Sequence, residues 1–160
     1  MPANEYEFLT EWHIAAPREL VYEILKEGKD YPRWWPQVYL NAESEPSGRE
    51  DHIGDKVHFF TKGYLPYRLR WTAEVVQHSK PHTIEITATG DFVGRGKWSL
   101  TPESDGTFVA FDWRLRADKS LLKWLSPIFK PIFRWNHHWA MARGYESLRR
   151  EIERRFSLQS

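Results

Sequence analysis

The chain has 160 residues, a formal net charge of +1 and no cysteine, which excludes a disulfide framework, a thiolate nucleophile and any metal site that needs sulfur ligands. This length corresponds to one domain, and we expect a single domain over residues 1–160. Aromatic residues make up 16% of the chain, with 9 Trp, 7 Tyr and 9 Phe, which is more than a core of this size usually needs.

A strand, two short helical segments and a second strand are expected first. Residues 5–14 alternate apolar and polar side chains, which is typical of a half-buried strand. A helix is expected to open at Ala16-Pro17, where apolar residues recur at spacings of three and four, and to end at Gly28. The prolines of residues 31–36 predict one helical turn or a tight connector that presents Trp34 and Trp35. The second strand is expected at residues 38–44.

The middle of the chain is typical of an antiparallel meander, because turn signals at residues 46–48, 63–66, 80–81 and 104–106 separate alternating segments. The covering element is expected last, as a short apolar stretch at residues 120–125, interrupted by Pro127 and Pro131, and then a helix from Pro131 to about Arg155. This order predicts an α+β fold. The inward stripe of the helix is expected to be Trp135, Trp139, Ala142, Tyr145, Leu148 and Ile152.

Charge is unevenly distributed along the chain. Residues 1–113 contain 12 Lys or Arg and 18 Asp or Glu, whereas residues 114–160 contain 11 and 4. The basic C-terminal third either attracts an anionic ligand, lipid surface or nucleic acid, or forms a solvated helix face. The helical spacing of its arginines with Glu146, Glu151 and Glu153 favours the solvated face.

Three groups of residues carry a family resemblance. They are Phe8, Trp12, Ile14, Ala16, Pro17, Val21 and Tyr22 with the cluster at 31–36; the stretch GKWSLTPESDGTFVAFDW at 96–113; and Asn136 to Met141 with Gly144 and Leu148. Together they resemble the START-like helix-grip superfamily (SRPBCC), and within it the polyketide cyclase/dehydrase and lipid-transport group. The resemblance implies a curved antiparallel sheet of six to seven strands around a long C-terminal helix, two short helices after the first strand, and an internal cavity for a hydrophobic small molecule.

The wedge between such a sheet and a single helix gives the surplus aromatic residues a use. These side chains either line a cavity or pack together as core. We expect the ligand-binding residues to be Trp71, Trp98, Phe111, Trp113, Asn136, Trp139 and Arg143.

Candidates for catalysis are few. Arg143 is the expected oxyanion partner, His138 an acid/base, and Tyr145 either an acid/base or an orienting hydroxyl. Arg143 can equally lie at a rim with its head in water. Adjacent helical residues diverge by about 100°, so at most one of His137 and His138 faces a cavity. The remaining histidines form no ligand set and no Gly-rich phosphate loop is present, so neither a metal nor a cofactor is expected.

Residues 121–135 interleave large apolar side chains with Lys and Arg. This pattern predicts either a segment that contacts an anionic membrane surface or one that packs against residues 34–35. The chain has no apolar stretch of 18 residues and no signal-peptide pattern, so we expect a cytoplasmic protein, at most peripheral to a membrane.

The leading functional hypothesis is binding or transport of a hydrophobic small molecule, lipid-like or polycyclic, in the cavity. The alternatives are a polyketide cyclase, aromatase or dehydratase that acts on a ligand in the same cavity, and a membrane-associated lipid-transfer module. Nucleic acid is not expected as a partner. The sequence does not separate a monomer from a dimer.

Overall fold

The computed structural model describes residues 5–63, 68–117 and 120–159, with the side chains of residues 117, 120–130 and 159 outside the description. Helices and strands follow one another in the order expected from the sequence. They are β1 (Glu5–Ile14), α1 (Arg18–Lys26), η1 (Gly28–Asp30), α2 (Tyr31–Trp34), β2 (Tyr39–Glu45), β3 (Lys56–Lys62), β4 (Arg68–Ser79), β5 (Thr83–Gly90), β6 (Phe92–Glu103), β7 (Gly106–Ala117) and α3 (Ser120–Gln159).

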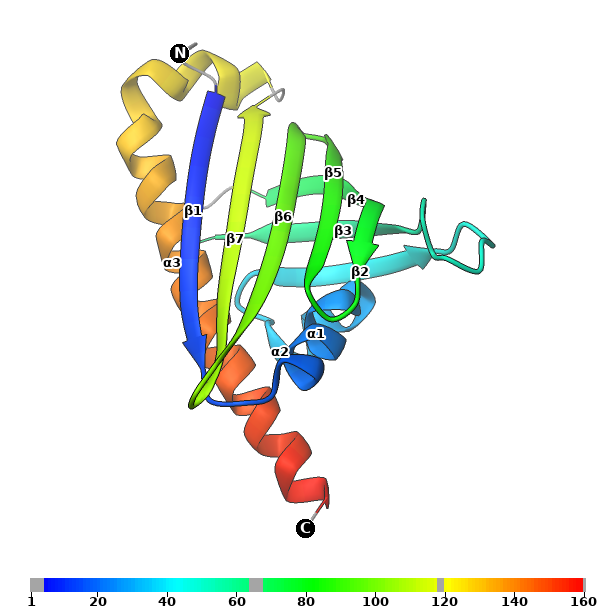
Figure 1. The fold of residues 1–160 in the computed structure, drawn as a ribbon. Coiled ribbons are helices and arrows are strands. Elements are labelled where there is room, and N and C mark those ends of the chain that lie inside the picture. The colour runs from blue at the N-terminus through cyan, green and yellow to red at the C-terminus, as the bar shows by residue number, and fades with distance from the viewer. Residues whose placement is uncertain (1–4, 64–67, 118–119, 160) are drawn as a thin grey trace.

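The seven strands form one antiparallel sheet in the order β1-β7-β6-β5-β4-β3-β2, so β1 and β2 are its outer strands. Figure 1 shows that the sheet curves strongly, because β2, β3 and β4 cross the direction of β1 and β7. Register shifts in β2 and β4 each leave one residue unpaired, Leu40 and Val76, and such bulges bend a strand. The predicted α+β fold with a curved sheet and a long C-terminal helix is confirmed.

Alternation along the strands places the large side chains on the inner, concave face. In β1 the side chains of Tyr6, Phe8, Trp12 and Ile14 are buried, and the predicted strand at residues 5–14 is confirmed. The central strands add a shared apolar surface to this face, formed by Phe59, Trp71, Ala73, Ile84, Trp98, Leu100, Val109, Phe111 and Trp113. Alternating patterns therefore located this half of the core correctly.

Helix α3 is longer than the sequence suggested. The expected helix began at Pro131, whereas α3 begins at Ser120 and includes both prolines. Pro127 and Pro131 are four residues apart, so the hydrogen bonds that they remove lie on one side of the helix. The chain bends there instead of stopping, and in Figure 1 the first part of α3 (yellow) runs at an angle to the rest.

The buried face of α3 also differs from the expected stripe. Trp135 is 50% exposed and Ala142 is exposed, whereas Met141, Gly144, Leu148 and Ile152 are buried. The predicted stripe contains Trp135 and Ala142, whereas the face of α3 that lies toward the sheet contains Gly144. Leu148 and Ile152 belong to both the predicted and the observed face, and Trp139 and Tyr145 of the predicted stripe also pack, partly buried, against the core.

Candidate ligand-binding site

Two cavities lie inside the curved sheet. The smaller one, which we name the α3 cavity, has a volume of about 170 Å³ and lies between α3 and the sheet. Its described lining is mostly aromatic and aliphatic, with Thr61, Lys62, Asn136 and His137 as the polar members. The described residues that line it are Tyr6, Phe8, Trp35, Val38, Tyr39, Thr61, Lys62, Gly63, Leu69, Trp71, Phe92, Phe111, Trp113, Leu115, Phe133, Asn136, His137, Ala140 and Met141.

The larger one, which we name the α1 cavity, has a volume of about 570 Å³ and extends from the sheet toward α1 and η1. Its inner wall is apolar and includes Leu25, Val57, Phe59, Ala73, Ile84 and Trp98. Its charged members are Lys26, Glu27, Lys29, Asp55, Lys56 and Lys80. A cavity of this size with an apolar inner wall falls within the range of small-molecule sites.

Trp71 is fixed in the wall between the two cavities. Its indole Nε1 donates a hydrogen bond of 3.2 Å to the hydroxyl of Thr61, which in turn donates to the carbonyl of Leu69 at 3.4 Å. The ring packs against Phe59 at 4.9 Å and Phe92 at 5.0 Å between centroids. The indole is therefore held in one orientation with its polar atom satisfied, which leaves an apolar surface toward a ligand.

Trp35 also lines both cavities, and α3 makes room for it with a glycine. A Cβ atom placed on Gly144 would lie 2.4 Å from Cζ2 of Trp35, so any larger residue there would displace the ring. Trp35 is 2% exposed, and its Nε1 has no hydrogen-bond partner among the described residues.

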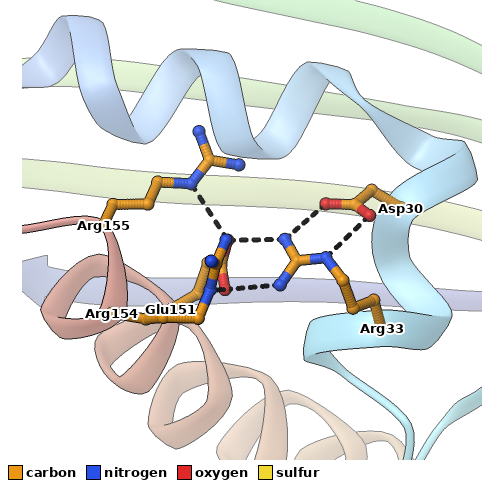
Figure 2. A network of polar contacts seen from close by, with 5 residues as sticks. All are labelled: Asp30, Arg33, Glu151, Arg154 and Arg155. Carbon is orange, nitrogen blue, oxygen red and sulfur yellow. Dashed lines mark hydrogen bonds and ion pairs between the residues drawn. The ribbon is translucent and has the colours of Figure 1, made fainter. Parts of the chain in front are cut away.

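A polar network joins the segment before Trp35 to the C-terminal half of α3 (Figure 2). Arg33 of α2 donates two hydrogen bonds to the Glu151 carboxylate, at 2.9 and 2.6 Å, and two more to Asp30. Arg154 and Arg155 also donate to Glu151, each at 2.9 Å. Burial opposes ionisation of Glu151, but the arginine hydrogen bonds outweigh it and lower the pKa of this carboxyl well below its usual range. The network fixes α2, and with it Trp35, against α3.

His137 is the histidine that the fold brings into the α3 cavity. Its ring stacks on Phe8 with 4.1 Å between centroids, and its Nε2 is buried with no hydrogen-bond partner among the described residues. Burial, with a smaller contribution from the neighbouring His138, lowers the pKa of His137 to about 3. The ring is therefore neutral at physiological pH.

The expected binding residues divide into two groups. Trp71 and Phe111 line both cavities, Trp98 lines the α1 cavity, and Trp113 and Asn136 line the α3 cavity. Trp139 and Arg143, and the catalytic candidates His138 and Tyr145, are not among the described residues that line either cavity.

Two of these side chains have other partners. The Tyr145 hydroxyl donates to the carbonyl of His13 at 3.2 Å, and Arg143 donates to Glu146 at 3.2 Å. The catalytic roles expected of Arg143, His138 and Tyr145 stay a prediction.

Sequence reasoning missed Trp35, Tyr39 and Met141, which line both cavities. Trp35 and Tyr39 flank an irregular segment that has no periodicity from which a facing direction can be read. Met141 lies one residue away from the stripe assigned to α3. Its position four residues after His137 is the signal that would have placed the two side chains on one face.

Two further features bear on the sequence expectations. Among the described residues, no group of three or more His, Asp or Glu side chains is placed to hold a metal ion. Of the helices in the described part of the chain, none combines the length and the apolar composition that a bilayer crossing needs.

Residues 121–130 of the predicted membrane segment have side chains outside the described set. In its remaining part, Ile132 is 39% and Trp135 is 50% exposed, while Phe133 lines the α3 cavity.

Comparison with known proteins identifies the class to which this fold and cavity belong. The model of the family described as polyketide cyclase/dehydrase and lipid transport matches residues 7–153. The chain therefore belongs to this family. No curated protein matches the chain.

Solved structures confirm the START-like helix-grip fold. The Zhui aromatase/cyclase from Streptomyces sp. R1128 has a TM-score of 0.73 and 16% identity, over 95% of this chain and 96% of that one. A START superfamily protein from Mycobacterium smegmatis has a TM-score of 0.71 and 15% identity, over 94% and 97%. The di-domain ARO/CYC BexL of the BE-7585A biosynthetic pathway has a TM-score of 0.71 and 14% identity over 92% of this chain, which spans half of the BexL length.

Proposed function

We propose that this protein binds a hydrophobic small molecule, lipid-like or polycyclic, in the α1 and α3 cavities. The observation that supports the proposal is the wall itself. Large aromatic side chains border two adjoining cavities instead of filling the space, and a few polar side chains, such as Thr61 and Asn136 of the α3 cavity, lie among them. Such a wall gains free energy from apolar burial, and its polar atoms orient the ligand.

The test combines identification of bound material with a variant that fills the cavity. Native mass spectrometry of the purified protein, followed by solvent extraction, is expected to reveal a co-purifying apolar compound. Ala140→Trp places an indole in the α3 cavity and is expected to weaken binding at least about tenfold, which is about 1.4 kcal/mol. Ala142→Trp is the matched control, because Ala142 is exposed on the same helix and lines neither cavity. Equal affinities for the two folded variants would contradict the proposal.

A second candidate is chemical turnover of the same ligand by ring closure or dehydration. The family to which the chain belongs and its likeness to the Zhui aromatase/cyclase support it. Residues of the α3 cavity would then hold a folded substrate conformer, since positioning alone accelerates intramolecular reactions. Incubation with a poly-β-keto thioester tests this candidate. A new aromatic product with the native protein, absent with Ala140→Trp, supports turnover, and unchanged substrate argues for binding alone.

Contact with an anionic membrane is a third candidate, at the turn of α3 beside the α3 cavity. Ile132 and Trp135 are exposed, Arg134 lies between them, and Phe133 of the same turn lines the cavity. Apolar side chains beside a cation suit the boundary between lipid tails and anionic headgroups. The native protein is expected to sediment with phosphatidylserine vesicles, and the double variant Ile132→Ser with Trp135→Ser is expected to remain in the supernatant. Phe156→Ser, at an exposed position on the far end of α3, serves as control.

A further inference from the structure

We propose that the α1 and α3 cavities are two halves of one ligand chamber, and that the side chain of Met141 divides them and so sets the length of ligand that binds. This inference rests on the proposed binding function and adds a specificity-determining residue to it. The cavities share five lining residues, namely Trp35, Tyr39, Trp71, Phe111 and Met141. They therefore adjoin along a common wall.

The volumes support a joint chamber. Ligand pockets usually measure about 300–1,000 Å³. The α3 cavity alone, at about 170 Å³, is below that range, whereas the α1 cavity has about 570 Å³. A ligand that occupies the larger space can use the smaller one only by passing the shared wall.

Four members of the shared wall are held in place. Trp71 is fixed by its hydrogen bond to Thr61. Phe111 stacks between Trp98 at 4.2 Å and Trp113 at 5.4 Å between centroids. Trp35 and Tyr39 pack on each other at 4.9 Å. Moving any of these rings would disturb several contacts at once.

Met141 differs from the four rings. It is 6% exposed on α3, and its unbranched side chain has three rotatable bonds that adapt to irregular space. Because it reaches the wall from the helix while the other members come from the sheet and the segment after α2, its rotamer decides whether the two spaces are joined.

A series of straight-chain fatty acids of about 8 to 20 carbons measures the length of the chamber, because each buried methylene tightens binding by roughly fourfold until the space is full. Tryptophan fluorescence reports binding, and the chain length at which affinity stops rising is the readout. Met141→Ala is expected to move this break point to longer chains, and Met141→Trp to shorter ones. Ile152→Ala is the matched control, since Ile152 is equally buried on α3 but lines neither cavity.

The outcomes separate the two proposals. A break point that shifts in opposite directions in the two Met141 variants and stays unchanged in Ile152→Ala supports the divided chamber. A native protein that binds the series with a break point unaffected by either Met141 variant overturns the role of Met141 and leaves the binding function standing. If the native protein binds no member and no apolar compound co-purifies, the binding function fails, and the divided chamber fails with it.

Discussion

His137, a half-buried side chain in the wall of the α3 cavity, makes the stability of the protein depend on pH. The pKa of His137 in the folded protein is about 3, below the ordinary value of 6.5. Between these two pH values the unfolded chain binds more protons than the folded one. The contribution of the neutral His137 to the free energy of unfolding is therefore fully present above pH 6.5 and is lost as the pH falls below it. The free energy of unfolding should fall by up to about 1.4 kcal/mol per pH unit.

Urea unfolding between pH 7 and 5 checks this expectation, because the carboxylates with lowered pKa lose their contribution only at lower pH. His137→Phe keeps an aromatic ring beside Phe8 and should flatten the dependence. The control is His138→Phe, which changes the exposed neighbour on the same helix. A steep dependence that survives in His137→Phe would assign the acid sensitivity to another group.

Gly144 is a second position at which one residue affects the wall of the cavities, because it leaves room for the Trp35 ring. An alanine in a helix is ordinarily about 1 kcal/mol more favourable than glycine, but its Cβ atom at position 144 would collide with the Trp35 ring. Overpacking of this kind costs about 1–3 kcal/mol. We therefore expect Gly144→Ala to lower the free energy of unfolding and to change the near-UV circular dichroism of the tryptophans.

Ala142→Gly, at an exposed position on the same helix, measures the helix-propensity contribution separately. Gly144→Ala could instead stabilise the protein by the same amount by which Ala142→Gly destabilises it. Helix propensity alone would then explain both changes, and the contact between Trp35 and α3 would not contribute to stability.

At the scale of elements, the network in Figure 2 is what fixes α2 against α3. The Glu151 side chain is 2% exposed and faces three guanidinium groups, which are themselves 28–48% exposed. Water therefore screens part of each ion pair. We expect Glu151→Gln to lower the free energy of unfolding by about 1–3 kcal/mol, since it removes the negative charge and leaves the arginines facing one another.

Denaturant titrations of Glu151→Gln and of Glu153→Gln compare the buried and the exposed carboxylate on the same turn of α3. The exposed substitution should change stability by less than about 0.5 kcal/mol. Tryptophan fluorescence should also shift only in the Glu151 variant, because the network positions the segment that precedes Trp35. Similar losses in both variants would mean that the network contributes no more than ordinary surface charge.

At the scale of the whole molecule, a bound ligand should raise the resistance of the sheet and α3 to unfolding together. A ligand at 100 times its dissociation constant adds about 2.7 kcal/mol to the free energy of unfolding. For a domain of this size that corresponds to a rise in Tm of about 5–10 °C. Differential scanning calorimetry with the tightest-binding fatty acid should show this rise for the native protein and for Ala142→Trp. A comparable rise for Ala140→Trp would place the ligand elsewhere.

The fold followed from the sequence wherever local periodicity governs structure. The strand at residues 5–14 and the alternating segments around Trp71 and Trp113 were predictable, because inner and outer faces alternate along a strand. The start of α3 was not, since Pro127 and Pro131 predict an interruption and a helix that begins at Pro131, whereas α3 continues through both prolines with a bend. Of the cavity wall, mainly the residues that belong to the strands could be predicted, namely Trp71, Trp98, Phe111 and Trp113.

The rest of the wall depends on tertiary packing. The direction in which Trp35 points is set by Gly144 and by the network around Glu151, and both partners lie more than 100 residues away in the chain. The choice between His137 and His138 depends on the exact rotation of α3, and one residue of error reverses it.

The order of the strands has a further consequence. The sheet is open at β1 and β2, and exposed outer strands are templates on which other chains can add. Both strands point glutamates into solvent, Glu7 and Glu11 on β1 and Glu43 and Glu45 on β2. Two copies that met edge to edge at neutral pH would bring these like charges together, which opposes pairing. The sheet can thus remain open at both sides without seeding the growth of a fibre.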